Sequence, residues 1–152
     1  MRGLAAAGDA RLSCSVQAVS GWCPAEHLDH CAKVARLMLE VVNSAGALPA
    51  GNGISTLGRV ILIFGWIPRG RGKAPKRVFG SRVDGAALLA SLQEVEELVE
   101  RVDAAAVSRS RVPVVPHPKF GGLTGDEALR FIDIHNRHHL RIITDIERAA
   151  RA

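Results

Sequence analysis

Aromatic side chains are scarce in this chain of 152 residues. They make up 4% of it, with no tyrosine, four phenylalanines and two tryptophans. Immunoglobulin-like sandwiches rely on buried aromatics at set positions, and platforms for single-stranded nucleic acid stack bases on aromatic rings. Both classes are therefore poor fits, and alanine, leucine, valine and isoleucine have to form the core.

Cysteine is also rare, with only Cys14, Cys23 and Cys31. The three form no C-x-x-C pair, and an odd number leaves one thiol over in any disulfide scheme, which favours a reducing compartment. A thiolate metal site built from Cys23, Cys31 and His27 lacks a fourth ligand at a usual spacing. We therefore expect a cytoplasmic protein and no cysteine metal site.

No apolar run is long enough to cross a membrane. The longest, residues 60–67 (VILIFGWI), has less than half of the roughly 20 residues that a bilayer requires, and Arg59 and Arg69 flank it. The apolar stretch at residues 4–7 is too short for a secretory signal. We interpret residues 60–67 as core; the alternative is an interfacial anchor assisted by the basic residues that follow.

The remaining composition is typical of a single globular domain. Hydrophobic residues make up 47% of the chain and charged residues 23%, and its length is close to the commonest domain size. We therefore expect residues 1–152 to form one domain. The net charge of +5 permits acidic partners without requiring them.

Two long helices are predicted in the first two thirds of the chain. Pro24, a residue favoured at the first helical position, opens a helix that extends to Asn43. Its buried arc is expected to hold His30, Val34, Leu37, Met38 and Val41. Asp84 is suited to cap a second helix, in which apolar residues recur at three- and four-residue steps. Those residues are Leu88, Leu92, Val95, Val99 and Val102.

The other segments complete an all-α pattern. Thr124 and Glu127 form a capping box, and the helix that they open runs without a breaker to about Arg148. Residues 1–12 are expected to form a helical turn or two, and residues 54–67 a short helix. Residues 46–53, the basic stretch 69–82 and the proline-rich stretch 108–122 are predicted loops. No segment shows convincing strand alternation, so we predict a helical bundle.

The histidines carry the strongest chemical signal. His135 and His139 are four residues apart on the last helix, about 40° from each other within a stripe of aliphatic residues. Burying an imidazole without partners costs about 1–3 kcal/mol, so two of them in such a stripe call for a compensating interaction. Helical histidines at this spacing can chelate one divalent ion. His138 lies nearer the edge of the stripe and is the weaker candidate.

Each of these residues also has a structural interpretation. Histidines at this spacing are common, and many hydrogen-bond to carboxylates or backbone carbonyls. On the first long helix both His27 and His30 fall within the apolar arc, so helical geometry does not decide which of them completes a three-histidine site. Glu26, one turn before His30, is a candidate general base or orienting group; its alternative is a carboxylate that stabilises the helix N-terminus.

The charged residues outside the histidine helices give weaker predictions. Asp133 is expected to face solvent, and Asp145 either faces solvent or supports a ligand histidine. The stretch from Arg69 to Arg82 is either a solvated connector or a contact for an anionic substrate. Nucleic-acid binding is not expected, because the chain has neither a recognition helix nor interleaved aromatics.

Two segments carry a family resemblance. The run GWCPAEHLDHCAKV resembles the helix-2 signature of the DinB-like superfamily, in which a histidine follows eight residues after the tryptophan; His30 holds that position. The run HPKFGGLTGDEALRFIDIHNRHHLRII resembles the closing segment of that family, and His135 and His139 match its two histidines. With the middle portion included, the resemblance spans about residues 4–148.

The resemblance implies both a fold and a function. The fold is an up-down-down-up four-helix bundle, and the implied ligands of a Zn²⁺ or Ni²⁺ ion are His30, His135 and His139. Members of the family include S-transferases that use low-molecular-weight thiols, hydrolases and isomerases, often as homodimers. We therefore expect a metal-dependent enzyme that activates a thiol or water, with Glu26 as a catalytic candidate. The alternative is a catalytically silent scaffold that dimerises or binds a ligand.

The chain departs from the family pattern at three places. Cys23 stands where the family has a capping serine, and Ile142 stands where many relatives have glutamine. The first helix of the bundle is expected to be shortened, which would leave one flank of the bundle either open or covered by a second subunit.

Overall fold

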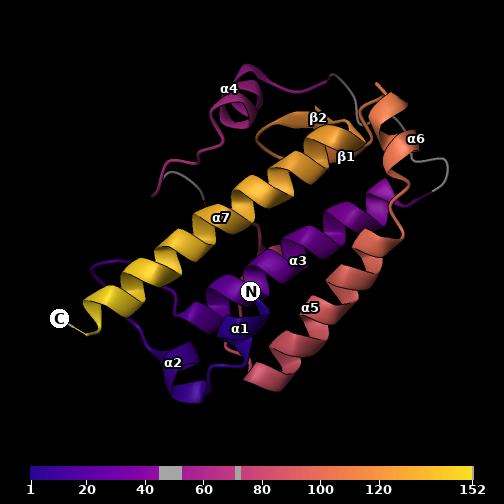
Figure 1. Ribbon diagram of the computed structural model, residues 1–152. Coiled ribbons are helices and arrows are strands. Elements are labelled where there is room, and N and C mark those ends of the chain that lie inside the picture. Colours follow the sequence, from indigo (N-terminus) through magenta and orange to yellow (C-terminus); the bar gives the residue numbers. More distant parts are fainter. Residues whose placement is uncertain (45–52, 71–72, 152) are drawn as a thin grey trace.

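The computed structural model describes residues 1–44, 53–70 and 73–151 (Figure 1). The predicted turn at 46–53, Gly53 apart, lies outside the described residues, as do Arg71 and Gly72 of the basic stretch. In chain order the helices are α1 (Arg2–Ala5), α2 (Asp9–Ser13), α3 (Pro24–Val42), α4 (Thr56–Phe64), α5 (Gly85–Glu100), α6 (Ala104–Arg109) and α7 (Gly125–Ala149). A 3₁₀ turn, η1 (Lys76–Val78), precedes α5, and a hairpin of β1 (Val115–His117) and β2 (Gly121–Leu123) precedes α7.

Three long helices form the body of the molecule, with α3 packed against both α5 and α7 (Figure 1). The helices α3 and α5 run in the same direction, and their C-terminal ends are adjacent. There the Asn43 side chain, just beyond α3, donates to the Leu98 carbonyl near the end of α5 (2.8 Å). The helix α7 runs the other way, since Met38 late in α3 and Phe131 early in α7 share one apolar cluster. This arrangement confirms the predicted all-α, DinB-like bundle.

The long helices begin where the sequence predicts. Pro24 opens α3 after a capping box in which the Cys23 N–H donates to the Glu26 carboxylate (2.8 Å). Cys23 therefore fills the position of the expected serine. The Asp84 side chain accepts from Ala87 N–H at the start of α5, and the Thr124 capping box opens α7. Each cap satisfies backbone donors that have no partner inside the helix.

Two short helices, α1 and α2, precede α3, which agrees with the expectation of a shortened first helix. The helix α1 packs on α5 and α2 packs on α3, and each buries one apolar side chain, Ala5 and Leu12. The Arg11 guanidinium reaches across to Glu147 on α7 with two hydrogen bonds of 2.5 and 2.8 Å. The predicted turn or two of helix at residues 1–12 is confirmed.

The proline-rich stretch 108–122 is not wholly loop, and that prediction was wrong. Val115 pairs with Leu123 and His117 with Gly121 in a short antiparallel hairpin. Gly121 adopts a positive φ of 78°, a backbone conformation that favours glycine. The two strands are too short to give an alternation signal. Pro116 is tolerated because it lies in β1, which pairs only with β2 among the described residues.

The apolar run 60–67 is only partly core, which corrects the prediction. Ile61 and Leu62 are buried, but Ile63, Phe64 and Trp66 are 71%, 76% and 57% exposed. The helix α4 is also shorter than the predicted 54–67, because Ser55 caps its start and Gly65, with φ 63°, ends it. In the described residues no helix is long and apolar enough to span a membrane.

The second long helix ends earlier than its apolar repeat suggests. Val102 continues the three- and four-residue spacing, yet α5 stops at Glu100. Asp103 then caps the separate helix α6 by accepting from Ala106 N–H (3.0 Å), so the local cap takes precedence over the apolar period.

Candidate metal centre

Four buried histidines meet where α3 crosses α7. His27 and His30 come from the first turns of α3, and His135 and His139 come from the middle of α7. Because the two helices run in opposite directions, the earlier histidine of each pair faces the later one of the other: His27 contacts His139 and His30 contacts His135. The ring centroids of His30, His135 and His139 lie 4.6–4.9 Å apart.

The orientation of His30 follows from a backbone contact. Its Nδ1 lies 2.6 Å from the carbonyl oxygen of Val78 in η1. A carbonyl oxygen only accepts, so Nδ1 carries the proton and Nε2 of the neutral ring keeps its lone pair. That Nε2 lies 3.1 Å from Nε2 of His135. The arrangement matches the way metal-binding histidines donate their other ring nitrogen to a carbonyl.

His135 is the least satisfied of the four rings. It is 8% exposed, and its Nδ1 is buried with no hydrogen-bond partner among the described residues. Since His30 Nε2 is unprotonated, His135 Nε2 donates to it in the metal-free protein, which leaves Nδ1 as a bare, buried acceptor. A buried acceptor without a partner costs about 1–3 kcal/mol.

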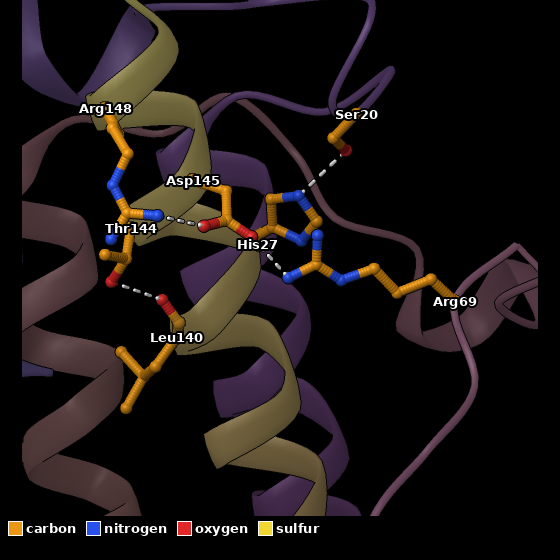
Figure 2. A network of polar contacts seen from close by, with 7 residues as sticks. All are labelled: Ser20, His27, Arg69, Leu140, Thr144, Asp145 and Arg148. Carbon is orange, nitrogen blue, oxygen red and sulfur yellow. Dashed lines mark hydrogen bonds and ion pairs between the residues drawn. The ribbon is translucent and has the colours of Figure 1, made fainter.

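His139 is held by His27, and His27 by Ser20. The Nδ1 atoms of His27 and His139 are 2.8 Å apart, and the Ser20 hydroxyl lies 2.9 Å from His27 Nε2. Figure 2 shows Ser20 directed at the His27 ring and Arg69 reaching from its loop to Asp145 on α7. His27 is only 3% exposed, and each of its ring nitrogens has a partner within the protein.

Aromatic rings surround the histidines. Trp22 lies edge-on to His27 and His30, with ring centroids 5.4 and 5.2 Å away, and also contacts the half-exposed Phe79. Phe131 lies 5.4 Å from His135, measured between ring centroids. These rings limit the access of water, which strengthens electrostatic interactions inside the cluster.

Burial keeps the histidines neutral near pH 7. It lowers the pKa of His27 to about 4 and that of His135 to about 3, and the neighbouring His30 adds to both shifts. Burial also lowers the pKa of His30 and His139; in His30 the hydrogen bond to Val78 partly opposes this effect. Neutral imidazoles are the form that binds a metal ion, because the ligand nitrogen must offer its lone pair.

The donor set fits a divalent ion. One nitrogen from each of His30, His135 and His139 lies within 4.8 Å of the other two. Zinc–nitrogen bonds of about 2.1 Å in tetrahedral geometry place ligand nitrogens about 3.4 Å apart, so small ring rotations bring the three to binding distance. Three protein ligands leave a fourth position open, as catalytic zinc sites do.

Helical geometry alone did not decide whether His27 or His30 completes a three-histidine site. In the structure His30 belongs to the three-histidine group and His27 does not. His138 lies outside the group as well. Its ring meets that of His139 edge-on at 5.1 Å, and burial lowers its pKa.

Glu26 has structural contacts that account for its position. Its carboxylate accepts the Cys23 N–H and pairs with Arg82 at 3.6 Å. A first-turn carboxylate stabilises the helix N-terminus, which was the structural interpretation of this residue. Its catalytic role stays a prediction.

Asp133 and Asp145 of α7 pair with arginines, and the cysteines form no disulfide among the described residues. Asp145 binds Arg69 (2.7 Å) and Arg148 (3.3 Å), and the exposed Asp133 pairs with Arg137. The recorded partners of Asp145 are thus arginines and not ligand histidines. The three cysteines are free, and burial raises the pKa of the Cys31 thiol, which keeps it protonated.

Sequence patterns did not reveal two contacts of the cluster. The Val78 carbonyl that orients His30 comes from the basic stretch 69–82, whose composition predicted only a loop. The Ser20 hydroxyl precedes α3 by four residues and lies outside any helical period. No local signal points to either, since both depend on how distant segments pack.

One comparison with known proteins identifies the family. The family model described as the DinB superfamily matches residues 10–143. No curated protein and no solved structure matches the chain. The family match covers α3, the segment that follows it and α7 as far as Ile143, and so includes all four buried histidines. The chain belongs to the DinB superfamily.

Proposed function

We propose that this protein is a metal-dependent enzyme that activates a low-molecular-weight thiol or a water molecule, with Zn²⁺ or Ni²⁺ as its ion. The observation that supports the proposal most strongly is the convergence of three buried, neutral imidazoles from two helices within 4.8 Å. The proposed ligands are His30, His135 and His139. When bound, such an ion lowers the pKa of a thiol or water in its open position toward neutrality.

The residues of the chain contribute orientation and the exclusion of water. Val78 fixes the His30 ring so that Nε2 faces His135, and the low pKa of the histidines keeps their lone pairs free at neutral pH. Trp22 packs edge-on against His30 and against the half-exposed Phe79, and these rings limit the access of water to that ligand. Burial is the main cause of the low pKa of His27, and the charge of the nearby, half-exposed Arg69 adds slightly to it. A guanidinium at this position can pair with an anionic group of a substrate in exchange for Asp145.

Metal binding by tag-free protein tests the proposal. After treatment with a chelator, the protein is titrated with Zn²⁺ and Ni²⁺ by calorimetry and then melted. A free metal concentration of 100 times Kd stabilises the fold by about 2.7 kcal/mol, which raises Tm by roughly 5–11 °C in a domain of this size. His139→Ala is expected to abolish both the heat of binding and the rise in Tm.

His138→Ala is the matched control, because His138 lies beside His139 on the same helix but outside the three-histidine group. This variant should bind metal nearly as well as the original protein. The absence of bound metal and of any stabilisation would favour the silent scaffold instead. The predicted homodimer is a separate part of the proposal, and sedimentation velocity measures it directly.

A further inference from the structure

His27 is a buried histidine that the three-histidine group does not use. It is 3% exposed, yet hydrogen-bonding partners occupy both of its ring nitrogens: Ser20 Oγ at 2.9 Å from Nε2 and His139 Nδ1 at 2.8 Å from Nδ1. Both ring nitrogens are thus satisfied inside the core, and one of the two partners is itself a proposed metal ligand. The chain Ser20–His27–His139 ends on a proposed metal ligand.

The position of the protons in this chain decides whether His139 can bind a metal through its free nitrogen. Two neutral imidazoles joined through their Nδ1 atoms share one proton, so one ring donates and the other accepts. If His27 donates, the proton of the neutral His139 ring resides on Nε2, and that nitrogen has no lone pair. If His139 donates, its Nε2 is bare, and the His27 proton lies on Nε2, directed at Ser20 Oγ.

We infer that His27, supported by Ser20, is a positioning residue that holds the proton of His139 on Nδ1 and thereby leaves His139 Nε2 as the metal-binding nitrogen. The inference rests on the proposed metal site and specifies how one of its ligands is prepared. His30 has an equivalent support in the Val78 carbonyl. Two of the three proposed ligands thus have Nδ1 held by an acceptor, as is usual for histidines that bind metals.

The distances also argue against His27 as a fourth ligand. Its Nδ1 is 2.8 Å from His139 Nδ1, a hydrogen-bond distance, whereas nitrogens that share a tetrahedral ion are about 3.4 Å apart. Both ring nitrogens of His27 are occupied, so ligation would break one of these hydrogen bonds. The open coordination position is therefore left for a substrate or water.

Two substitutions at position 27 separate hydrogen bonding from ring packing. His27→Phe keeps a planar ring but cannot accept a proton, and His27→Asn restores an acceptor oxygen close to the position of Nδ1. We expect His27→Phe to weaken Zn²⁺ binding by about 10–100-fold, the range typical of such supporting partners, and His27→Asn to recover most of that loss. The control is His138→Phe, which changes the residue next to His139 without removing a hydrogen bond to His139. This variant should keep its Zn²⁺ affinity within about threefold of the original protein.

Long-range ¹H–¹⁵N NMR of the histidines reads the proton positions directly and does not depend on activity. In the metal-free protein we expect His139 protonated on Nδ1, and in His27→Phe a mixture of the two neutral forms. Either a His139 protonated on Nε2 in the original protein or unchanged Zn²⁺ affinity in His27→Phe would overturn the inference. A metal-induced ¹⁵N shift on His27 as large as those of the ligand nitrogens would do the same, because it would make His27 a ligand.

The two proposals can fail separately. If the original protein binds no Zn²⁺ or Ni²⁺, the proposed function fails, while the NMR measurement on the metal-free protein still decides the role of His27. If the original protein binds metal and His27→Phe binds it equally well, only the inference fails. Melting curves of each metal-free variant show whether a loss of affinity comes from a loss of fold.

Discussion

Acidification is expected to destabilise the metal-free protein because its histidines are buried in the neutral form. The pKa of His27 is lowered to about 4 and that of His135 to about 3, mainly by burial, whereas an unfolded chain keeps both near 6.5. Below pH 6.5 the unfolded state therefore binds more protons than the folded state. Stability from these groups is complete above pH 6.5 and is lost as the pH falls through 6.5 toward the folded pKa values.

The magnitude follows from the pH interval. At pH 5 the unfolded histidine is 1.5 pH units below its pKa of about 6.5, and at about 1.4 kcal/mol per unit each buried ring costs about 2 kcal/mol. His27 and His135 together cost about 4 kcal/mol, and the lowered pKa values of His30 and His139 act in the same direction. For a domain of this size we expect Tm to fall by roughly 8–16 °C.

Circular dichroism melts of chelator-treated protein at pH 7.5 and pH 5, at one ionic strength, measure this effect. Burial also lowers the pKa of His117, to about 4, and that of His138, so both rings add to the loss over this interval. His135→Leu removes one titrating ring and should reduce the loss by about 2 kcal/mol. A Tm at pH 5 within 3 °C of the value at pH 7.5 would refute the neutral, buried state of these rings.

Two further predictions concern the segments that support the site. A Cβ on Gly80 would lie 2.1 Å from the Glu26 carbonyl oxygen, so Gly80→Ala should push the segment around Gly80 and Val78 away from α3. We expect a loss of about 1–3 kcal/mol in the free energy of unfolding, measured by thermal melts, and weaker Zn²⁺ binding. Gly3→Ala is the control, because nothing lies within 4 Å of the added Cβ, and it should change neither quantity. Arg11→Ala removes the pair with Glu147 that ties α2 to α7, and hydrogen exchange should become faster in α2 while the amides of α3 keep their protection.

The sequence predicted the parts of the fold that have local causes. Pro24, Asp84 and Thr124 act on the backbone within three residues of themselves, and the helices start there. The spacing of His135 and His139 likewise required only the helical period, and both rings are buried as that period predicts. A rule that depends on neighbours in the chain can be applied to the chain alone.

The parts that the sequence did not predict depend on tertiary packing. The run at 60–67 was interpreted as core from its apolarity, but the short helix α4 buries only one side, so Ile63 and Phe64 remain exposed. The Val78 carbonyl and the Ser20 hydroxyl become partners of histidines only once η1 and the segment before α3 fold against the bundle. Hydrophobicity and spacing carry no information about such contacts.

The histidines interrupt what would otherwise be one continuous apolar seam between α3 and α7. On α7, Phe131 and Ile134 belong to one apolar cluster and Ile143 to another, and His135 and His139 lie between them. Aliphatic side chains there would join the two clusters and would remove both the unpartnered Nδ1 of His135 and the sensitivity to acid. The bundle thus gives up stability at its centre, and such a local conflict with good packing is typical of a functional site. A metal ion that binds only the folded state would restore this stability through mass action, so the same residues that weaken the metal-free fold would strengthen the loaded one.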